Sequence, residues 1–520
     1  MKSRAHAPKQ PQRPPDLTSW IQPAAIGAAA LAGAAWFLHS EHEIAGAWGY
    51  SLDDSWIYAT YAKNVATGHG YAFNPGEHIA GATGPLYVYL LALIYLVFQD
   101  VVLPVKILGV LCLAASGILV HRIVRRILPD SRYGPLVAGV LVGCSPPLLW
   151  GALSGLEVPE YLLIACLGLY GYVRSRWTLA VAIWSIGVWL RPDGMLLVLL
   201  GIALRPRIDL RSALVSLAVA AAIIGPYLAF NEMVGGSLLP NSVSVSHGAG
   251  SGFFADQWNM GRQVADLWGI ARRSGGTGFH APLLIPGIVV GSVLMARNWP
   301  VLVTYALAFP FALALYRPWS GQFSRYIVYA VPFGMMLAVI GYEWACRRAL
   351  GSRCGQGVLF LGAICLAWQV YEARVTGISH GWNVQNINGM QRFVAESVRR
   401  STSPGDTVAV NDVGAMGYFS GCYVVDLVGL VSPRMGFPEY LRRYRPKYLI
   451  VFPEWFRAFV AVDEKTKQIV FYDADSTYKY SPYYGVRLKK NTIAARNTMY
   501  FFERMPRGET GPSSVQLVVH

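Results

Sequence analysis

Long apolar runs alternate with short basic clusters between residues 21 and 371 of the chain. An apolar run of about 20 residues can cross the roughly 30 Å hydrocarbon core of a bilayer as a helix. On this criterion we predict about eleven transmembrane helices. They are residues 21–38, 101–120, 134–150, 161–173, 177–190, 195–204, 213–230, 281–296, 301–316, 326–345 and 357–371. The run 86–98 offers roughly 20 Å of helix, so we predict a re-entrant or interfacial helix there.

Composition supports a polytopic membrane protein. Of the 520 residues, 54% are hydrophobic and only 14% are charged, and the mean hydropathy is +0.37. The net charge of +15 comes mostly from Lys and Arg in short loops, which favours membrane orientation over nucleic-acid binding. The seven cysteines imply no disulfide framework.

The basic residues also set the expected orientation. The N-terminal tail, residues 1–20, is basic and is expected in the cytoplasm, so the run 21–38 is an uncleaved anchor and the first loop, residues 39–100, lies outside. With the run 86–98 kept on the outer face, the later loop arginines fall inside. They are Arg122, Arg125, Arg126, Arg174, Arg176, Arg205, Arg207, Arg211, Arg297, Arg347, Arg348 and Arg353. We therefore predict a multi-pass protein of the inner (plasma) membrane with a transmembrane domain over residues 21–371.

The pattern changes after residue 371. The segment GMQRFVAESVRR predicts an amphipathic helix, TVAVND a strand that enters a loop, and PKYLIVF and NTMYFFERM two further strands. Residues 372–520 are therefore predicted to form a soluble α/β or α+β domain outside the cytoplasm, which binds or orients an acceptor. Six of its aromatic residues can stack on sugars or pack the domain's own core. They are Trp382, Tyr418, Tyr478, Tyr480, Tyr483 and Tyr484.

An acidic pair, Asp53 and Asp54, opens the first outer loop. Neighbouring carboxylates raise each other's proton affinity, which suits a base that takes a proton from a hydroxyl. The alternative is that the pair begins an exposed acidic loop.

Further polar residues gather on the same predicted face, where ionisable groups at span ends are functional candidates. The cations are Lys63, Arg191, Arg317 and Arg325, and the other candidates are His69, His78, Glu157, Asp193 and Asn241. Structural roles remain open for some of them: Arg191 and Asp193 can cap a short helix pair, Glu157 can favour a helix N-terminus, and the histidines can be solvated. Hard oxygen ligands for a divalent metal are present, but their spacing does not imply one, so we predict no required cofactor and no metal site.

Five stretches in chain order carry a resemblance. They are DDSWIYATYAKNVATGHGYAFNPGEHIAGATGPLY, SGLE, LRPDG, GGSLLPNS and FSRY. The chain resembles the GT-C superfamily of polytopic glycosyltransferases that use polyprenyl-phosphate sugars. Within it, the chain is most similar to the group of the mycobacterial terminal β-(1→2) arabinofuranosyltransferase. The stretch RPDG departs from that group's pattern.

The resemblance implies a GT-C membrane domain whose donor is anchored by its lipid and whose acceptor is a cell-envelope glycan. Asp53 would be the catalytic base, and Asp54 would orient it or share the proton. Arg325 and Arg191 would bind the donor phosphate, helped by Arg317 and Lys63, because arginine grips phosphate with two parallel hydrogen bonds. The sugar would be a pentofuranose such as arabinofuranose.

Two other classes of protein remain open. A lipid-linked sugar transporter or flippase would place its charges near the middle of the membrane, whereas the polar residues here lie on one face. An inactive envelope-assembly partner would tolerate loss of the acidic pair, so replacement of Asp53 by Asn separates it from an enzyme.

Overall fold

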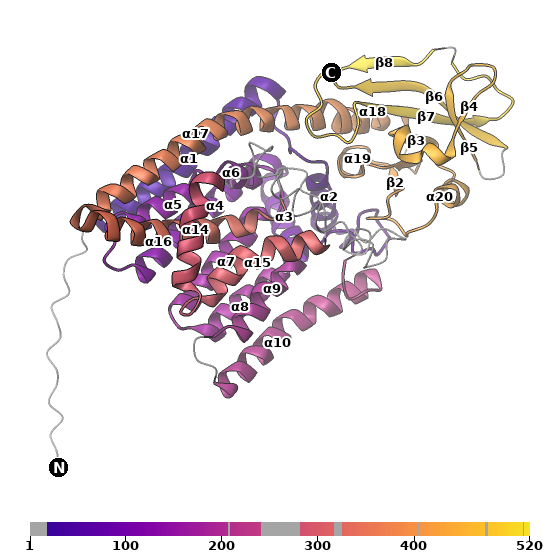
Figure 1. Cartoon of the computed structure of the whole chain (residues 1–520). Coiled ribbons are helices and arrows are strands. Elements are labelled where there is room, and N and C mark those ends of the chain that lie inside the picture. The colour runs from indigo at the N-terminus through magenta and orange to yellow at the C-terminus, as the bar shows by residue number, and fades with distance from the viewer. Residues whose placement is uncertain are drawn as a thin grey trace.

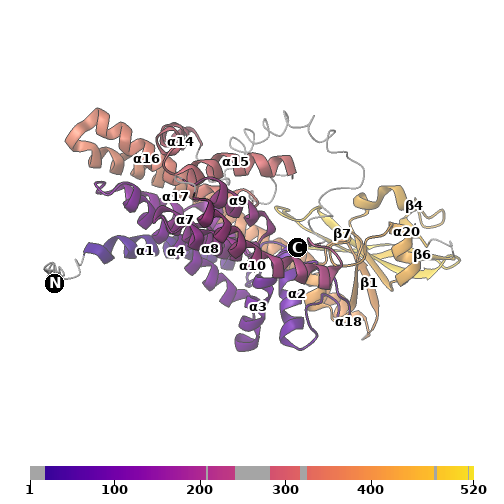
Figure 2. The same cartoon turned by 90° about the horizontal axis from the view of Figure 1, so that it is seen from below.

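A computed structural model describes residues 18–205, 209–240, 281–316, 325–403, 405–473, 477–512 and 514–520. A helical region comes first in the chain, and a C-terminal domain built on a β-sheet follows it (Figure 1). Seen from below, the sheet domain lies against one end of the helical region (Figure 2).

The apolar runs of the sequence form the helices of the first part. These are α1 (Thr18–Ala45), α2 (Asp54–Ala66), α3 (Pro85–Phe98), α4 (Val102–Ile127), α5 (Gly134–Gly143), α6 (Pro146–Leu153), α7 (Val158–Val173), α8 (Trp177–Val188), α9 (Met195–Ala203), α10 (Leu210–Gly235), α14 (Ala281–Met295), α15 (Pro300–Tyr316), α16 (Val331–Leu350) and α17 (Cys354–Ile387). Several begin with proline in the first turn, where the missing N–H costs nothing; examples are Pro85 of α3 and Pro146 of α6.

By length and composition, the described residues contain four helical stretches able to cross a membrane. They are Trp20–Ala45, Val102–Ile127, Leu210–Gly235 and the long stretch Val328–Ser401. The pair α5 and α6 adds a fifth if it is one span bent by 47°. This number is smaller than the predicted eleven because several apolar helices, such as α8 with 12 residues, are shorter than the usual ~20. The helix α3, predicted as non-spanning, is also short and apolar.

Close packing joins the helices of this region. The helix α1 runs along α17, and α4 packs on α5 and α7. On α14 and α16 the backbones touch: a Cβ added to Gly291 would lie 2.0 Å from the Leu337 carbonyl oxygen, and one added to Gly341 would lie 2.0 Å from the Gly287 oxygen. Small residues allow this approach, which supplies the contact area that stabilises apolar helix pairs.

A buried charged cluster connects three of these helices. Lys106 of α4 donates to both carboxylate oxygens of Glu41 on α1 at 2.5 Å, and His380 of α17 lies 2.9 Å from the same carboxylate. The side chains are 0–1% exposed. Since a buried charge is costly without its partner, this cluster holds α1, α4 and α17 in one arrangement.

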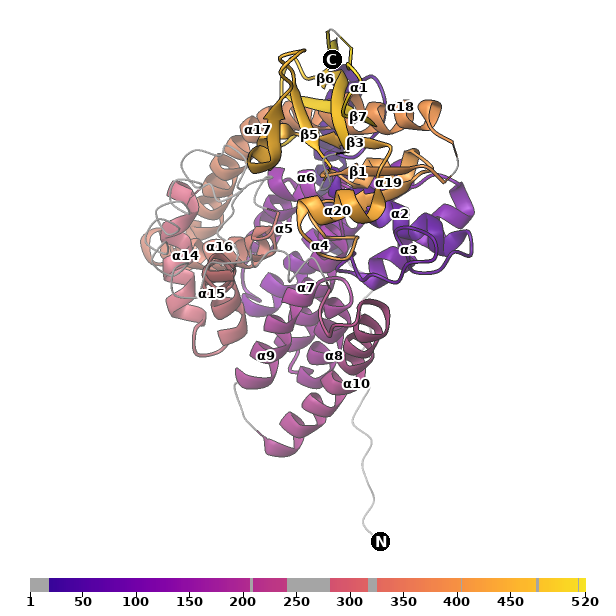
Figure 3. The same cartoon turned by 90° about the vertical axis from the view of Figure 1, so that its right-hand side faces the viewer.

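The C-terminal domain contains one eight-stranded mixed sheet among its described residues. The strands are β1 (Thr407–Val410), β2 (Tyr423–Asp426), β3 (Tyr448–Val451), β4 (Val460–Val462), β5 (Ile469–Tyr472), β6 (Tyr478–Arg487), β7 (Thr498–Pro506) and β8 (Gln516–Val519). Their order is β2-β1-β3-β7-β6-β5-β4, with β8 beside β6. The strands β2, β1 and β3 are parallel, and β3 pairs antiparallel with β7 (Figure 3). The helices α18 (Phe393–Ser401), α19 (Gly414–Phe419) and α20 (Phe437–Tyr444) accompany the sheet.

The elements predicted for this domain are confirmed. The segment GMQRFVAESVRR covers α18 except its last residue, and the three predicted strands are β1, β3 and β7; all residues of β3 are buried. The helix α17 continues through residue 372 to Ile387, so the chain has no break where the domain was predicted to begin.

The tyrosines proposed as sugar platforms mostly pack within the protein. Tyr480 is fully buried, Tyr484 lies 4.9 Å from Phe501, and the Arg504 guanidinium covers the Tyr478 ring at 3.7 Å. For these side chains the packing alternative holds, because their ring faces are already occupied.

Candidate active site

The segment between α1 and α3 is held against the C-terminal domain. The Asn74 side chain pairs with the backbone of Val424 in β2: its Nδ2 donates to the Val424 carbonyl at 2.9 Å, and its Oδ1 accepts from the Val424 N–H at 3.0 Å. On α2, Trp56 packs between Tyr50 and Phe419 of α19, with ring centroids 4.7 and 4.6 Å away. The acidic pair at the start of α2 therefore sits where the helical region meets the sheet domain.

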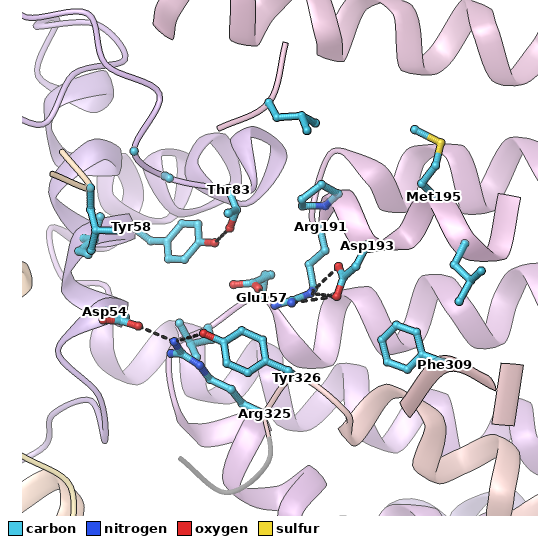
Figure 4. A pocket seen from close by; sticks show the side chains of 18 of the residues that line it. Asp54, Tyr58, Thr83, Glu157, Arg191, Asp193, Met195, Phe309, Arg325 and Tyr326 are labelled. Atoms are coloured by element: carbon cyan, nitrogen blue, oxygen red, sulfur yellow. Dashed lines mark hydrogen bonds and ion pairs between the residues drawn. The ribbon is translucent and has the colours of Figure 1, made fainter. Parts of the chain in front are cut away.

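A cavity of about 560 Å³ opens beside α2 (Figure 4). Its wall combines residues from α2, from the loop before α3, from both ends of the α8–α9 connection, and from the segment before α16. The lining residues are Asp54, Ile57, Tyr58, Gly81, Ala82, Thr83, Leu156, Glu157, Arg191, Pro192, Asp193, Met195, Leu196, Leu199, Leu239, Phe309, Arg325, Tyr326 and Leu430. The volume suits a small polar group with part of an apolar chain.

Asp54 and Arg325 form the first ion pair of the cavity. The Arg325 Nη2 donates to Asp54 Oδ2 at 2.6 Å and to the Tyr326 hydroxyl at 2.6 Å. The Arg325 side chain is 11% exposed, whereas the Asp54 side chain is 41% exposed and faces the open volume. A ligand can therefore reach the Asp54 carboxylate, whereas the Arg325 guanidinium is mostly buried and hydrogen-bonded to Asp54 and Tyr326.

Arg191 forms the centre of a second, larger ion cluster. Its Nη1 donates to Glu157 Oε1 at 2.5 Å, and its Nε and Nη2 donate to the two Asp193 oxygens at 3.0 Å. The sequence brings Arg191 and Asp193 together because Pro192 starts a tight 3-10 turn between α8 and α9. Glu157 comes from the loop before α7, and the Tyr329 ring lies under the guanidinium at 4.8 Å. The structure therefore shows Arg191, Asp193 and Glu157 as an ion cluster in the cavity wall.

The other end of the cavity is apolar. Met195, Leu196 and Leu199 of α9 line it together with Phe309 of α15, and Met195 and Phe309 lie across the cavity from Asp54 in Figure 4. Leu199 is 57% exposed, so the apolar end opens toward the outside of the helical region. The cavity therefore has a charged end and an apolar end.

Asp53 faces the sheet domain instead. Its carboxylate accepts the N–H groups of Gly414 and Ala415 at 2.7 and 2.8 Å, and it is not among the described residues that line the cavity. A Cβ on Gly414 would lie 1.9 Å from the Asp53 carbonyl oxygen, so glycine is needed for this close approach. The two neighbouring acids thus have different surroundings, which the sequence alone does not distinguish.

Burial and the nearby Asp412 carboxylate raise the pKa of Asp53 to about 8. Burial, together with the charge of Asp54, raises the pKa of Asp412 to about 6. Gln391 donates to Asp412 at 2.9 Å and opposes part of this rise. The contact between α2 and the sheet domain therefore contains acids that hold protons near neutral pH.

This proton uptake predicts a pH-dependent stability. A carboxyl whose pKa is about 8 when folded and 3.8 in an ordinary environment binds its proton more tightly in the folded state, so its contribution is present at low pH and is lost as the pH rises toward 8. We expect the melting temperature of the wild type to fall between pH 6 and 8.5. In Asp412→Asn this fall should be smaller, by roughly 2–4 °C for each kcal/mol of pH-dependent unfolding free energy that the substitution removes. Thermal unfolding followed by tryptophan fluorescence checks this. Glu439→Gln, which alters an exposed acid on α20, should keep the wild-type slope; an equal slope in Asp412→Asn would contradict the coupling.

The remaining predicted residues lie elsewhere. The Lys63 ammonium stands 4.9 Å over the Tyr418 ring and donates to the Tyr418 carbonyl, so it is directed at the sheet domain. His69 pairs with Thr67 at the surface, and His78 is exposed; neither is among the described residues that line the cavity. Asn241 and Arg317 lie outside the described residues.

Sequence reasoning missed several lining residues. Tyr58 follows Asp54 by four positions, so one helical turn places both on the same face of α2; this periodicity could have identified it. Tyr58 hydrogen-bonds to Thr83, which also lines the cavity. Leu430 of the C-terminal domain carried no signal, because only the tertiary contact brings it to the wall.

Within the described part of the chain, no three His, Cys, Asp or Glu side chains are arranged to hold a metal ion. Glu157 and Asp193, two of the acids that can supply oxygen ligands, are both engaged by Arg191. The cavity presents three carboxylates, Asp54, Glu157 and Asp193, paired with the guanidinium groups of Arg191 and Arg325.

The fold is similar to the folds of two solved proteins, ArnT and an archaeal oligosaccharyltransferase. ArnT from Cupriavidus metallidurans in the apo state has a TM-score of 0.55 at 13% identity, over 95% of this chain and 99% of that chain. The same protein bound to undecaprenyl phosphate has a TM-score of 0.53 at 13% identity, over 86% and 96% of the two chains. The Archaeoglobus fulgidus oligosaccharyltransferase in complex with Zn and sulfate has a TM-score of 0.54 at 12% identity, over 81% of this chain and 67% of that one. At such identities the likeness concerns the fold.

The sequence comparisons are less informative. Residues 377–502 match a family described as a domain of unknown function, DUF8728. No curated protein sequence matches the chain. The matched segment includes the end of α17 and most of the sheet, and therefore the loop that binds Asp53.

Proposed function

We propose that the chain is a membrane glycosyltransferase that moves a sugar from a polyprenyl-phosphate donor to a hydroxyl of a cell-envelope glycan. The observation that carries the proposal is the single cavity in which the Asp54–Arg325 pair and the Arg191 cluster meet an apolar wall. A lipid-linked sugar phosphate has the matching order of parts: a polar sugar, a charged phosphate and a long apolar chain.

The donor would lie along the cavity from its apolar end to its charged end. ArnT has been crystallised with undecaprenyl phosphate, and the likeness of fold supports a ligand of the same class here. The prenyl chain would lie against α9 and Phe309, and the phosphate would bind the guanidinium groups of Arg325 and Arg191. The Arg325 Nε has no hydrogen-bond partner among the described residues, so it can donate to an incoming phosphate. Lys63 and Arg317 remain proposals for secondary phosphate contacts.

Asp54 would be the base, a role that sequence analysis assigned to its neighbour Asp53. In the transfer, the acceptor hydroxyl gives its proton to the Asp54 carboxylate, and its oxygen forms a bond to the anomeric carbon of the sugar. The bond between that carbon and the phosphate oxygen breaks, and the polyprenyl phosphate leaves with the electron pair. Cations at the departing phosphate stabilise the charge that develops there.

This transfer requires no metal in the proposal, because arginines neutralise the leaving phosphate. Asp193 contributes by holding Arg191, and the proposed surroundings of the sugar include Glu157. Asn241, His69 and His78 remain proposals for contacts to the acceptor. Divalent cations added or removed with EDTA should change the rate by less than about threefold; a rate that depends on the ion would assign it a direct role.

The proposal keeps the predicted topology, with about eleven spans and with the site and the C-terminal domain outside the cytoplasm. The described helices able to span a membrane support a multi-pass protein. The sheet domain contributes Leu430 to the cavity and holds α2, so the acceptor would approach from its side.

The test is transfer by the purified protein. A panel of undecaprenyl-phosphate sugars, beginning with arabinofuranose, is incubated with envelope glycan fragments, and glycan product and free undecaprenyl phosphate are measured together. We expect one sugar to be transferred with equimolar release of undecaprenyl phosphate. Arg457→Ala, a change at an exposed position of the sheet domain, is the matched control and should transfer normally. Movement of donors across vesicle membranes without product would instead indicate a transporter.

A further inference from the structure

Glu157 has one carboxylate oxygen that makes no direct hydrogen bond to a described residue, although the Tyr58 hydroxyl lies near the carboxylate. Its Oε1 accepts from Arg191 at 2.5 Å, whereas Oε2 is buried and has no hydrogen-bond partner among the described residues. The side chain is 3% exposed and lines the cavity. The base and phosphate roles proposed above do not use this oxygen.

The position of Glu157 restricts what can reach it. In Figure 4 its carboxylate lies between the Asp54–Arg325 pair and the Arg191–Asp193 pair. The proposed function places the phosphate on the two arginines and the anomeric carbon near Asp54, so the attached sugar lies in the part of the cavity that Glu157 borders. The oxygen is therefore next to the ring of the transferred sugar.

The chemistry of the group also restricts its ligand. Arg191 donates to Glu157 at 2.5 Å, and a carboxylate paired with a guanidinium in this way accepts hydrogen bonds through both of its oxygens. A buried acceptor without a donor is costly, and hydrogen bonds to charged groups are among the stronger ones in proteins. Water can serve this oxygen between turnovers, but a ligand hydroxyl that replaces the water makes the contact selective.

We propose that Glu157 is a specificity-determining residue, whose free Oε2 accepts a hydrogen bond from a hydroxyl of the transferred sugar. This inference rests on the proposed function and adds to it the feature of the sugar that is recognised. A site built around such a bond rejects sugars without the hydroxyl, because the carboxylate oxygen then stays buried and unpaired.

The test combines changes in the protein with changes in the donor. Wild type and Glu157→Gln are assayed with the undecaprenyl-phosphate sugar that the wild type transfers, and with its set of monodeoxy derivatives. In Glu157→Gln the amide oxygen can still accept from Arg191, but the amide nitrogen that replaces Oε2 cannot accept a hydroxyl proton. We expect one deoxygenation to lower kcat/KM of the wild type by about 10- to 100-fold. The same deoxygenation should lower kcat/KM of Glu157→Gln by less than about threefold.

A second readout separates sugar recognition from support of Arg191. Binding of undecaprenyl phosphate without a sugar should change less than about threefold in Glu157→Gln, because the amide oxygen at position 157 still accepts from Arg191. The assignment would be overturned if every deoxygenation lowered kcat/KM of Glu157→Gln by the same factor as in the wild type. It would also be overturned if Glu157→Gln bound undecaprenyl phosphate more weakly. If the wild type transfers no sugar at all, the proposed function fails and the inference fails with it.

Discussion

Asparagine at position 54 should lower the rate of sugar transfer by about 10²- to 10⁴-fold, while the protein remains folded and binds its donor. The amide has nearly the size of the carboxylate but cannot accept the proton of the acceptor hydroxyl. In this variant Arg325 faces a neutral amide instead of the carboxylate at 2.6 Å, so undecaprenyl phosphate should bind at least as tightly as to the wild type. Single-turnover transfer and equilibrium binding of undecaprenyl phosphate measure the two effects separately.

Position 53 provides the matched control. Asp53→Asn alters the neighbouring carboxylate, which accepts the N–H groups of Gly414 and Ala415. One of these donors would then face an amide N–H₂, so we expect a stability loss of about 1–3 kcal/mol and a rate reduction below tenfold. If Asp53→Asn abolishes transfer in a folded protein and Asp54→Asn does not, the base is Asp53 and the proposed division of roles is wrong.

The second large effect is expected far from the cavity wall. Glu41→Gln should lower the free energy of unfolding by about 3–5 kcal/mol, because it leaves the Lys106 ammonium, 1% exposed, without a carboxylate. His380, also buried, loses its 2.9 Å partner at the same time. Thermal unfolding of the purified protein in detergent checks the loss. Transfer should decline only at temperatures where the variant unfolds.

A double variant shows whether charge burial is the cause. Glu41→Gln combined with Lys106→Met removes the uncompensated cation and replaces it with an apolar chain of similar length, so most of the lost stability should return. If the double variant is no more stable than the single one, the cluster stabilises the fold through the shape of Glu41 and not through its charge.

The arrangement of the acidic pair connects stability and chemistry. Asp54 faces the cavity, and Asp53, one residue away, accepts hydrogen bonds from the first two N–H groups of α19. A change in the contact between α2 and the sheet domain therefore moves the base as well. For this reason the C-terminal domain is part of the proposed site and not only an attached binding module.

The sequence by itself determined much of the local structure. Apolar runs with basic ends predicted the helices, since a helix must satisfy its own backbone in lipid. β-Branched and aromatic runs predicted β1, β3 and β7. It also identified most of the charged residues of the cavity, because Asp54, Glu157, Arg191, Asp193 and Arg325 are ionisable groups beside apolar segments. These signals are local, so they can be read along the chain.

Only the tertiary structure decided how those charges divide. Asp53 and Asp54 look alike in sequence, but the approach of Gly414, over 350 positions later, turns one of them into a domain contact and leaves the other in the cavity. Glu157 and Arg191 meet across 34 positions, and Asp54 and Arg325 across 271. Such pairings depend on which helix ends converge, and that is set by packing between distant segments, which no local pattern of residues records.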